Sequence, residues 1–322
     1  MGIPPIQELY QAPEWKIVNA ENKDKIKAMI STETTVGLTP AIGSIPLKCV
    51  GDLLEPAVNK RPRLEFVQQQ QSPLGFLWDY QHHSCPYDAL YTILADIWLQ
   101  NPLIWNRNFS AISNYLRLFA DGLSQVTAGR KTLENVRDDV RLMLNERNPI
   151  LFHREPQPSN LDQILAEMFQ MENSISSITI SCPHCGIVVQ PGDMCLYLPY
   201  MTVCGTSTSE GVKAWHNKRK RCPQCSRSCS TSDKYPESPN LLLIDLPGPG
   251  GNNYAVSKTV KTLHGNNTWS TLSLRGIIYL GGLHFVSRVI TKNKEVWYND
   301  GMQNSAMSVY ECKLSEISTQ DL

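Results

Sequence analysis

The sequence lacks a hydrophobic run long enough to cross a membrane, and its N-terminus lacks a basic region followed by an apolar stretch. We therefore expect an intracellular protein, cytoplasmic or nuclear, that does not engage a membrane. An excess of charge is also missing, because Lys plus Arg and Asp plus Glu number 30 each, so no overall field favours nucleic acid. The 322 residues, 41% of them hydrophobic, suffice for a sizeable core, which excludes a disordered or fibrous chain.

Cysteine is present but unevenly spread. Seven of the ten cysteines lie between Cys182 and Cys229, whereas Cys49, Cys85 and Cys312 stand alone. In a reducing compartment, thiols serve as metal ligands, nucleophiles or small buried residues rather than as disulfides. The clustered cysteines therefore indicate a metal site.

Residues 1–72 lack sustained hydrophobic periodicity and contain scattered Pro and Gly. We interpret them as a poorly ordered N-terminal arm with one short helix near residues 24–30. The basic stretch NKRPRLEF near its end fits a solvated linker or a nuclear localisation patch.

The remainder changes its period once. From Pro86 to Met171 apolar residues recur at helical spacing and predict four amphipathic helices, whose stripes we assign to the core. After Asn173 the period becomes two, in the runs ISSITIS, MCLYLPY, LLLIDLP, TLSLRGIIYL, LHFVSRVI and EVWYNDG. Helices followed by strands predict an α+β fold with an antiparallel sheet.

Two C-x-x-C pairs, SCPHCG and RCPQCS, carry the metal prediction. Each pair places two thiolates close together, and two pairs complete a tetrahedral set for zinc on Cys182, Cys185, Cys222 and Cys225. Four thiolates leave no open coordination position, so this zinc is structural. Other ligands remain open in His184, Cys195, Cys204, His216 and Cys229, and free thiols are the alternative. The neighbouring KRKR has no interleaved aromatics, so a solvated hairpin fits it better than nucleic acid.

Cys85 is the candidate nucleophile. Pro86 favours the first turn of a helix, and Asp88 lies in that same turn. The unpaired N–H groups and the dipole of a helix N-terminus favour the thiolate, which is the reactive form. The alternative is that Cys85 is simply a small buried residue, because a lone cysteine at a helix start often has that role.

A candidate base appears about two hundred residues later. His284 follows Gly281 and Gly282 on a predicted strand, and a short turn leads to a second strand that carries Asn299 and Asp300. A carboxylate or amide there can orient the imidazole, which in turn activates a thiol. A lone histidine on a strand usually has a structural role. The two preceding glycines favour a catalytic role instead, because they leave room for an extended substrate backbone.

These segments resemble the ubiquitin-specific proteases, a papain-like family of cysteine peptidases. Its nucleophile motif ends C-Y-x-N, similar to Cys85–Asp88, and its histidine box with W-Y-x-x-D-D is similar to the segments 281–285 and 297–300. The LLLIDLP run resembles the palm strand before that box, and the paired C-x-x-C motifs resemble the zinc ribbon of the fingers. The similarity covers about residues 75–315 and is to divergent forms, such as those carried by fungal mobile elements.

The resemblance implies a thumb at 80–172, zinc-ribbon fingers at 175–238 and a palm at 239–318, within a catalytic domain at 73–322. It implies a substrate path along Gly281, Gly282 and Trp297. Asp300 is preferred over Asn299 as the residue that orients His284. The family's oxyanion Asn, five residues before the nucleophile, is Tyr80 here. Gln81, His82 or His83 would replace it beside the Cys85 N–H, and Gln81 and His83 are our candidates.

The sequence thus predicts a thiol hydrolase that cleaves ubiquitin or a ubiquitin-like modifier after its C-terminal glycine. Cys85 is the nucleophile, His284 the base, zinc the structural cofactor and the modifier conjugate the partner. One alternative is an inactive module of the same fold that binds the modifier. The other is a nucleic-acid-binding zinc ribbon that uses KRKR.

Overall fold

The computed structural model describes most of the chain beyond residue 71. The described residues are 72–153, 158–170, 176–192, 196–198, 206–217, 219–235, 239–246, 254–264, 267–281, 284–319 and 321–322. All of them belong to one compact unit, Pro40–Leu322. The predictions of an N-terminal arm, of a helix near residues 24–30 and of a basic patch lie outside the described residues.

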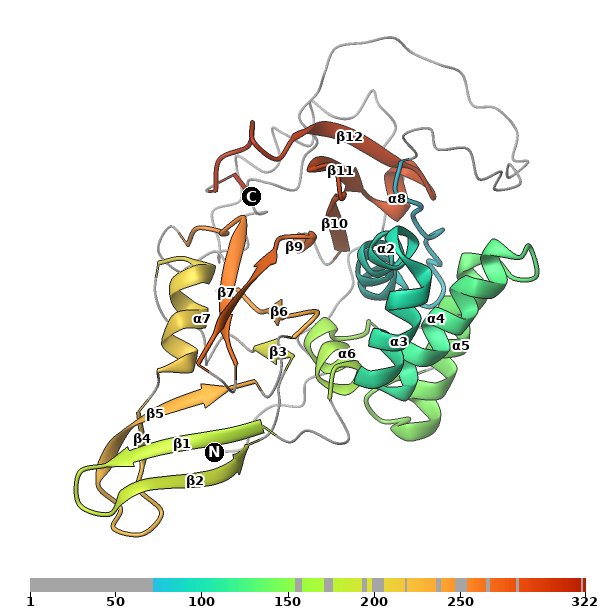
Figure 1. The fold of residues 1–322 in the computed structure, drawn as a ribbon. Helices are drawn as coiled ribbons and strands as arrows, with labels where there is room; N and C mark the ends of the chain where they lie inside the picture. Colours follow the sequence, from blue (N-terminus) through green and yellow to red (C-terminus); the bar gives the residue numbers. More distant parts are fainter. Residues whose placement is uncertain are drawn as a thin grey trace, which may run out of the picture. The chain divides into compact units, whose positions relative to one another are not determined.

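Helices come first along this part of the chain (Figure 1). They are α2 (Cys85–Gln100), α3 (Pro102–Ile112), α4 (Asn114–Thr127), α5 (Leu133–Arg147) and α6 (Leu161–Met168). The described residues of this region therefore hold five helices where the periodicity predicted four. No helix among the described residues is long and apolar enough to cross a membrane.

The extra helix, α3, arises from two local breaks that the apolar stripes did not reveal. Asn101 leaves helical geometry after α2, and its side chain accepts a hydrogen bond from the Ile104 N–H, with Pro102 at the first helical position. Ser113 is extended and caps α4 by accepting from the Leu116 N–H. Each cap ends one helix and starts the next. The apolar residues from Ile112 onward, which the periodicity assigned to one helix, are therefore divided between α3 and α4.

In the part of the chain that the structure describes, strands follow in two four-stranded antiparallel sheets and two two-stranded pairs. The first sheet has the order β2 (Gly186–Gly192), β1 (Ser176–Cys182), β5 (Ser228–Lys234), β4 (Arg219–Arg221). The second has the order β12 (Ser308–Lys313), β11 (Glu295–Asn299), β10 (His284–Ile290), β9 (Gly276–Gly281). The pairs are β7 (Thr259–Leu263) with β8 (Trp269–Ser273), and β3 (Tyr197–Leu198) with β6 (Leu243–Ile244). The predicted α+β class with antiparallel sheets is confirmed.

Two details differ from the expectation. The LLLIDLP run contributes only β6, which pairs in parallel with β3 and lies outside the four-stranded sheet that carries His284. A helix, α7 (Thr208–His216), occurs between the cysteine pairs and was not predicted. Its signal was the S-x-x-E box, since Ser207 caps the helix by accepting from the Glu210 N–H.

Helix α2 packs closely on the sheet β12-β11-β10-β9. A Cβ added to Gly276 in β9 would lie 2.5 Å from Ile93 of α2, so glycine allows this approach. Val289 of β10 belongs to the same buried cluster as the helices, whereas Val286 and Ile290 pack in a second cluster with Leu314. The sheet is therefore buried on both faces, and its strand β10 is fixed against the helix that starts with Cys85.

Candidate active site and metal centre

Cys85 begins α2 and is nearly buried, with 8% of its surface exposed. Ser84 precedes it, and Pro86 occupies the first turn, as the sequence indicated. The Ser84 hydroxyl donates to the Asp88 carboxylate at 2.5 Å and does not cap the helix through a side-chain bond. The sulfur of Cys85 is therefore presented from a rigid, packed helix start, among unpaired backbone N–H groups.

His284 lies beside Cys85 and Asp300. Its Nε2 lies 2.9 Å from Asp300 Oδ1, and the Cys85 thiol lies near enough to help raise the pKa of the imidazole. Because Nε2 of His284 contacts Asp300, we infer that the other ring nitrogen, Nδ1, faces the Cys85 sulfur. Three residues from two distant parts of the chain thus form one continuous line from thiol to imidazole to carboxylate.

The strand register explains why Asp300 meets His284. Ser287 of β10 pairs with Asn299 of β11, and opposed residues on antiparallel strands point to the same face. Asp300 directly follows this pair at the end of β11, and its Oδ1 lies 2.9 Å from His284 Nε2. Asn299 points to the other face, where its Nδ2 donates to the Ser308 hydroxyl at 3.4 Å.

Asp300 is itself held in place by a short helix. It caps α8 (Gly301–Asn304), and its Oδ1 accepts hydrogen bonds from the N–H groups of Met302 at 2.9 Å and Gln303 at 3.2 Å. Its side chain is 2% exposed. The carboxylate oxygen that meets the imidazole is therefore fixed by backbone donors before any substrate arrives.

The charge of His284 follows from these contacts. Burial pulls the pKa of His284 down, but the hydrogen bonds to Asp300 and to Cys85 outweigh it and raise the pKa to about 9. Around neutral pH the ring is thus an imidazolium. A cation beside a thiol favours the thiolate, which is the nucleophilic form.

The candidate oxyanion residues lie in the loop before Cys85, and they differ in burial and in the contacts of their side chains. Gln81 is exposed, and its Nε2 donates to the Tyr80 hydroxyl at 3.2 Å. His83 is half-buried, with a left-handed backbone at φ 46°. His82 pairs with Asp79, with Nδ1 to Oδ2 at 2.6 Å. The side chains of Gln81 and His82 thus have partners within the loop itself.

The predicted substrate-path residues are less closely grouped. Gly281 ends β9 and pairs with His284, so it lies beside the imidazole. Gly282 lies outside the described residues. Trp297 pairs with Val289 and packs on the helical core with an edge contact to Tyr310, at 5.4 Å between ring centroids.

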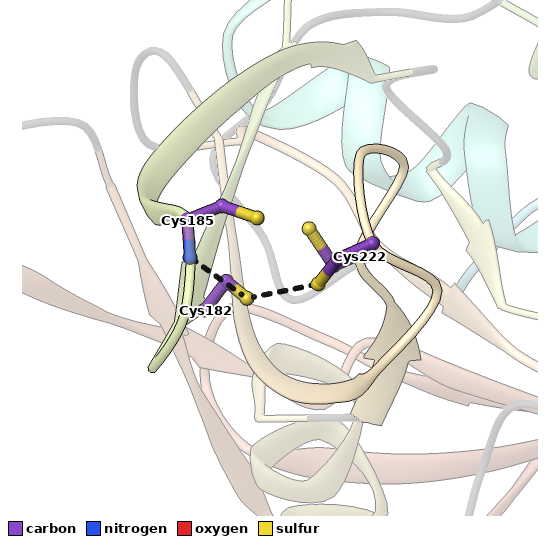
Figure 2. A group of neighbouring side chains, drawn as sticks. Cys182, Cys185 and Cys222 are labelled. Atoms are coloured by element: carbon purple, nitrogen blue, oxygen red, sulfur yellow. Dashed lines mark hydrogen bonds between the residues drawn. The ribbon is translucent and has the colours of Figure 1, made fainter.

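The predicted zinc ligands gather as expected. Cys182 and Cys185 flank the turn between β1 and β2, and Cys222 and Cys225 lie between β4 and β5. Their four sulfurs lie within 4.8 Å of one another. Sulfurs bound to one tetrahedral zinc lie about 3.8 Å apart, so the four thiols fit such an ion. Figure 2 shows the side chains of Cys182 and Cys185 reaching from one hairpin toward Cys222 on the other.

Backbone donors prepare this cluster for a cation. The N–H groups of Cys185 and His184 point at the Cys182 sulfur, at 3.4 Å each, and lower its pKa to about 6. Gly186 allows the tight turn with φ at +80°. Of the alternative ligands, His184 is exposed, and His216 instead accepts from the Leu263 N–H through Nε2. Cys229 is buried against the cluster, and Cys195 and Cys204 lie outside the described residues.

Two residues near the site, Trp78 and Arg137, were missed by the sequence reasoning. Trp78 contacts the His284 ring edge-on, with centroids 6.1 Å apart. Arg137 of α5 forms a buried ion pair with Asp88, with Nη1 to Oδ1 at 3.0 Å. The signal for Arg137 was its place among the apolar residues Leu133, Val136 and Val140 of one helix face. Trp78 had no local signal.

Comparisons with known proteins give remote likenesses. No protein-family model matches the sequence. No curated protein matches it either. A structure of the SAGA Ubp8/Sgf11/Sus1/Sgf73 DUB module bound to ubiquitin aldehyde is 12% identical, with a TM-score of 0.46, covering 79% of this chain and 69% of that one.

Two further solved structures are similar at the same level. The Saccharomyces cerevisiae PAN2 pseudoubiquitin-hydrolase is 13% identical, with a TM-score of 0.41 and coverage of 88% of this chain and 94% of that one. The MERS coronavirus papain-like protease is 15% identical, with a TM-score of 0.38 and coverage of 72% and 60%.

Proposed function

We propose that the chain is a cysteine hydrolase that cleaves ubiquitin or a ubiquitin-like modifier after its C-terminal glycine. The observation that carries this proposal is the line from Cys85 through His284 to Asp300, with the thiol at a helix start and the imidazole charged. A buried cysteine with a purely structural role needs neither a charged imidazole nor a carboxylate held by backbone donors.

In the proposed chemistry Cys85 is the nucleophile, His284 acts first as acid and then as base, and Asp300 orients the His284 imidazole. The Cys85 sulfur attacks the carbonyl carbon of the modifier's last residue, forming a C–S bond and an oxyanion. His284 gives its Nδ1 proton to the leaving amine as the C–N bond breaks. A water then attacks the thioester carbon and gives a proton to Nδ1, and as the C–O bond forms the C–S bond breaks, releasing the modifier's carboxyl end and the Cys85 thiolate. The Cys85 backbone N–H at the helix start is the first oxyanion donor.

The nature of the substrate rests on the motif resemblance and on the position of Gly281. Gly281 pairs with His284 at the end of a two-strand hairpin, so it offers no side chain beside the reacting atoms. An extended, Gly-rich C-terminal tail suits a path of this kind, because it too lacks bulk near the scissile bond. Ubiquitin and its relatives end in such a tail.

We propose zinc as the cofactor of the two cysteine hairpins, held by Cys182, Cys185, Cys222 and Cys225. The ion would join two turns and has no open position, so it would stabilise this sheet and take no part in hydrolysis. The sheet would then support the bound modifier at a distance from Cys85.

Hydrolysis of a fluorogenic C-terminal amide of ubiquitin tests this function. The wild type should release the fluorophore, Cys85→Ala should not, and His284→Ala should lose at least about a hundredfold. His82→Ala is the matched control, because the His82 side chain is held by Asp79 in the loop beside the site. Activity that persists in Cys85→Ala removes the proposed mechanism.

One observation favours the second candidate, a module that binds the modifier without cleaving it. Tyr80, which stands where the resembling family has its oxyanion Asn, is 65% exposed, and Gln81 directs its amide to Tyr80. A site short of an oxyanion donor loses on the order of a hundredfold or more in turnover. A wild type that binds ubiquitin but releases no fluorophore supports this candidate.

A further inference from the structure

We propose that Arg137 is a positioning residue that ties the Cys85 helix to the Trp78 segment lying against His284. Its role in turnover rests on the proposed function, whereas its structural role does not. A single atom makes both connections, because Arg137 Nη1 donates to Asp88 Oδ1 at 3.0 Å and to the Leu77 carbonyl at 2.8 Å.

Each of the two bonds leads to one half of the site. Asp88 lies in the first turn of α2, three residues after the nucleophile Cys85. The Leu77 carbonyl belongs to the peptide bond that joins Leu77 to Trp78. Arg137 is 2% exposed and its bond to Asp88 is buried, so water competes little with that bond.

Helix α5 holds this segment at further points. Glu134 accepts a hydrogen bond from the Leu77 N–H at 3.1 Å, so both peptide groups of Leu77 are bound by the same helix. Arg141 donates to the His82 carbonyl at 2.9 Å. Glu134, Arg137 and Arg141 are spaced three and four residues apart, on one side of α5. The loop before Cys85 is thus fastened near both of its ends.

The contacts of α5 with Leu77 fix the backbone next to Trp78 and thereby the position of the Trp78 side chain. Its ring contacts His284 edge-on, and its Cβ lies 3.2 Å from a Cβ built on Gly301, the residue after Asp300. Its Nε1 is buried, and no described residue accepts a hydrogen bond from it. An indole nitrogen without a partner does not fix its own ring, so the ring is placed by its backbone, which α5 holds.

The consequence for the site is geometric. The Trp78 ring lies against the His284 ring beside Asp300, where it limits the room the imidazole has to turn. Small misplacements of reacting groups cost large factors in rate. Loss of Arg137 should therefore loosen Trp78 and reduce turnover, although Arg137 touches neither His284 nor the substrate.

Indole hydrogen exchange in a ¹⁵N-labelled chain tests this role, with the Trp78 signal identified by its loss in Trp78→Phe. In the wild type the Trp78 Nε1 hydrogen should exchange slowly, because it is buried. In Arg137→Met it should exchange roughly tenfold faster or more. Trp297 is the internal control, since its Nε1 is also buried without a partner among the described residues, on β11.

Arg275→Met is the matched control variant. Arg275 binds Asp96 of the same helix α2 and the Ile290 carbonyl, both at 2.8 Å, so its loss also breaks an ion pair and a backbone contact. Arg275→Met should lower stability without changing Trp78 exchange. Arg137→Met should also lower kcat by roughly tenfold or more with little change in KM.

The proposal is overturned if Trp78 exchange in Arg137→Met matches that in Arg275→Met, since Arg137 would then only stabilise the fold. If Arg137→Met does not fold, Glu134→Ala serves instead, because it removes the acceptor of the Leu77 N–H at a half-buried position. Unchanged Trp78 exchange in Glu134→Ala would likewise overturn the proposal. If the wild type hydrolyses nothing, the proposed function fails, but the exchange rates still decide the role of Arg137.

Discussion

Asp300 faces His284 with the same oxygen that caps α8. That oxygen lies 2.9 Å from His284 Nε2 and accepts from the N–H groups of Met302 and Gln303, so its position does not depend on the imidazole. A carboxylate fixed in this way sets the ring orientation and leaves Nδ1 directed at Cys85. The roles of the two neighbouring candidates, Asp300 and Asn299, can therefore be separated by substitution.

Asp300→Ala should lower turnover on the order of a hundredfold or more, because His284 loses both its orientation and the charge that stabilises the imidazolium. Asn299→Ala should leave turnover nearly unchanged and cost about 1 kcal/mol of unfolding free energy, since Asn299 bonds Ser308 away from the site. Steady-state kinetics and urea unfolding of both variants measure this. The reverse ranking in turnover would assign the orienting role to Asn299.

The raised pKa of His284 predicts a loss of stability at alkaline pH. The folded-state pKa is about 9 and the ordinary value is 6.5, so the folded protein retains a proton that the unfolded chain releases. This contribution is complete below about pH 6.5 and disappears as the pH rises through about 9. The wild type should therefore lose stability relative to His284→Gln across that window.

Urea midpoints of the two proteins at intervals from pH 6 to pH 10 measure this difference. Asp300→Asn should reduce it, because the neutral amide no longer favours the imidazolium. A midpoint difference that does not vary with pH would mean that His284 is neutral in the folded protein.

Removal of the metal should affect the cysteine hairpins and spare the nucleophile. Cys182→Ser with Cys222→Ser, or a chelator, should destabilise the sheet of β1, β2, β4 and β5, since the free energy of zinc binding contributes to folding. Alkylation of Cys85 by iodoacetamide should continue at the wild-type rate. Metal analysis should return about one zinc per chain. A value near zero in protein purified without chelators would contradict the metal assignment.

The packing of α2 on β9 predicts that Gly276→Ala lowers the stability of the fold independently of the metal site. Gly276→Ala should cost about 1–3 kcal/mol, because the new Cβ would lie 2.5 Å from Ile93. Combining Gly276→Ala with Ile93→Ala should cost less than the sum of the two single changes, since the shorter side chain removes the clash. Additive costs in thermal or urea unfolding would show that α2 and β9 do not pack in this way.

Features that depend on near neighbours in the sequence were predictable. Pro86 indicated the start of α2, and each C-x-x-C pair forms its turn within four residues, so the local pattern already contains the geometry. The hairpin that brings Asp300 to His284 is also local, because only a short turn separates β10 from β11.

Features that join distant segments were not predictable in the same way. The ion pair of Arg137 with Asp88 spans 49 positions, and no periodicity says which charge on a helix turns inward. The contact of Trp78 with His284 joins the loop before α2 to a strand near the C-terminal end, so it depends on the packing of helix on sheet. The break between α3 and α4 was missed because Ile112 fitted the stripe of either helix.

We propose above that Cys85 is a nucleophile activated by His284 at a site that receives a modifier tail. A ubiquitin probe with a C-terminal electrophile, analysed by intact mass and peptide mapping, tests it most directly. We expect one adduct, on Cys85, which is lost in Cys85→Ala and forms at least about tenfold more slowly in His284→Ala. A wild type whose Cys85 reacts with iodoacetamide but forms no adduct with the probe, or an adduct on another cysteine, would contradict it.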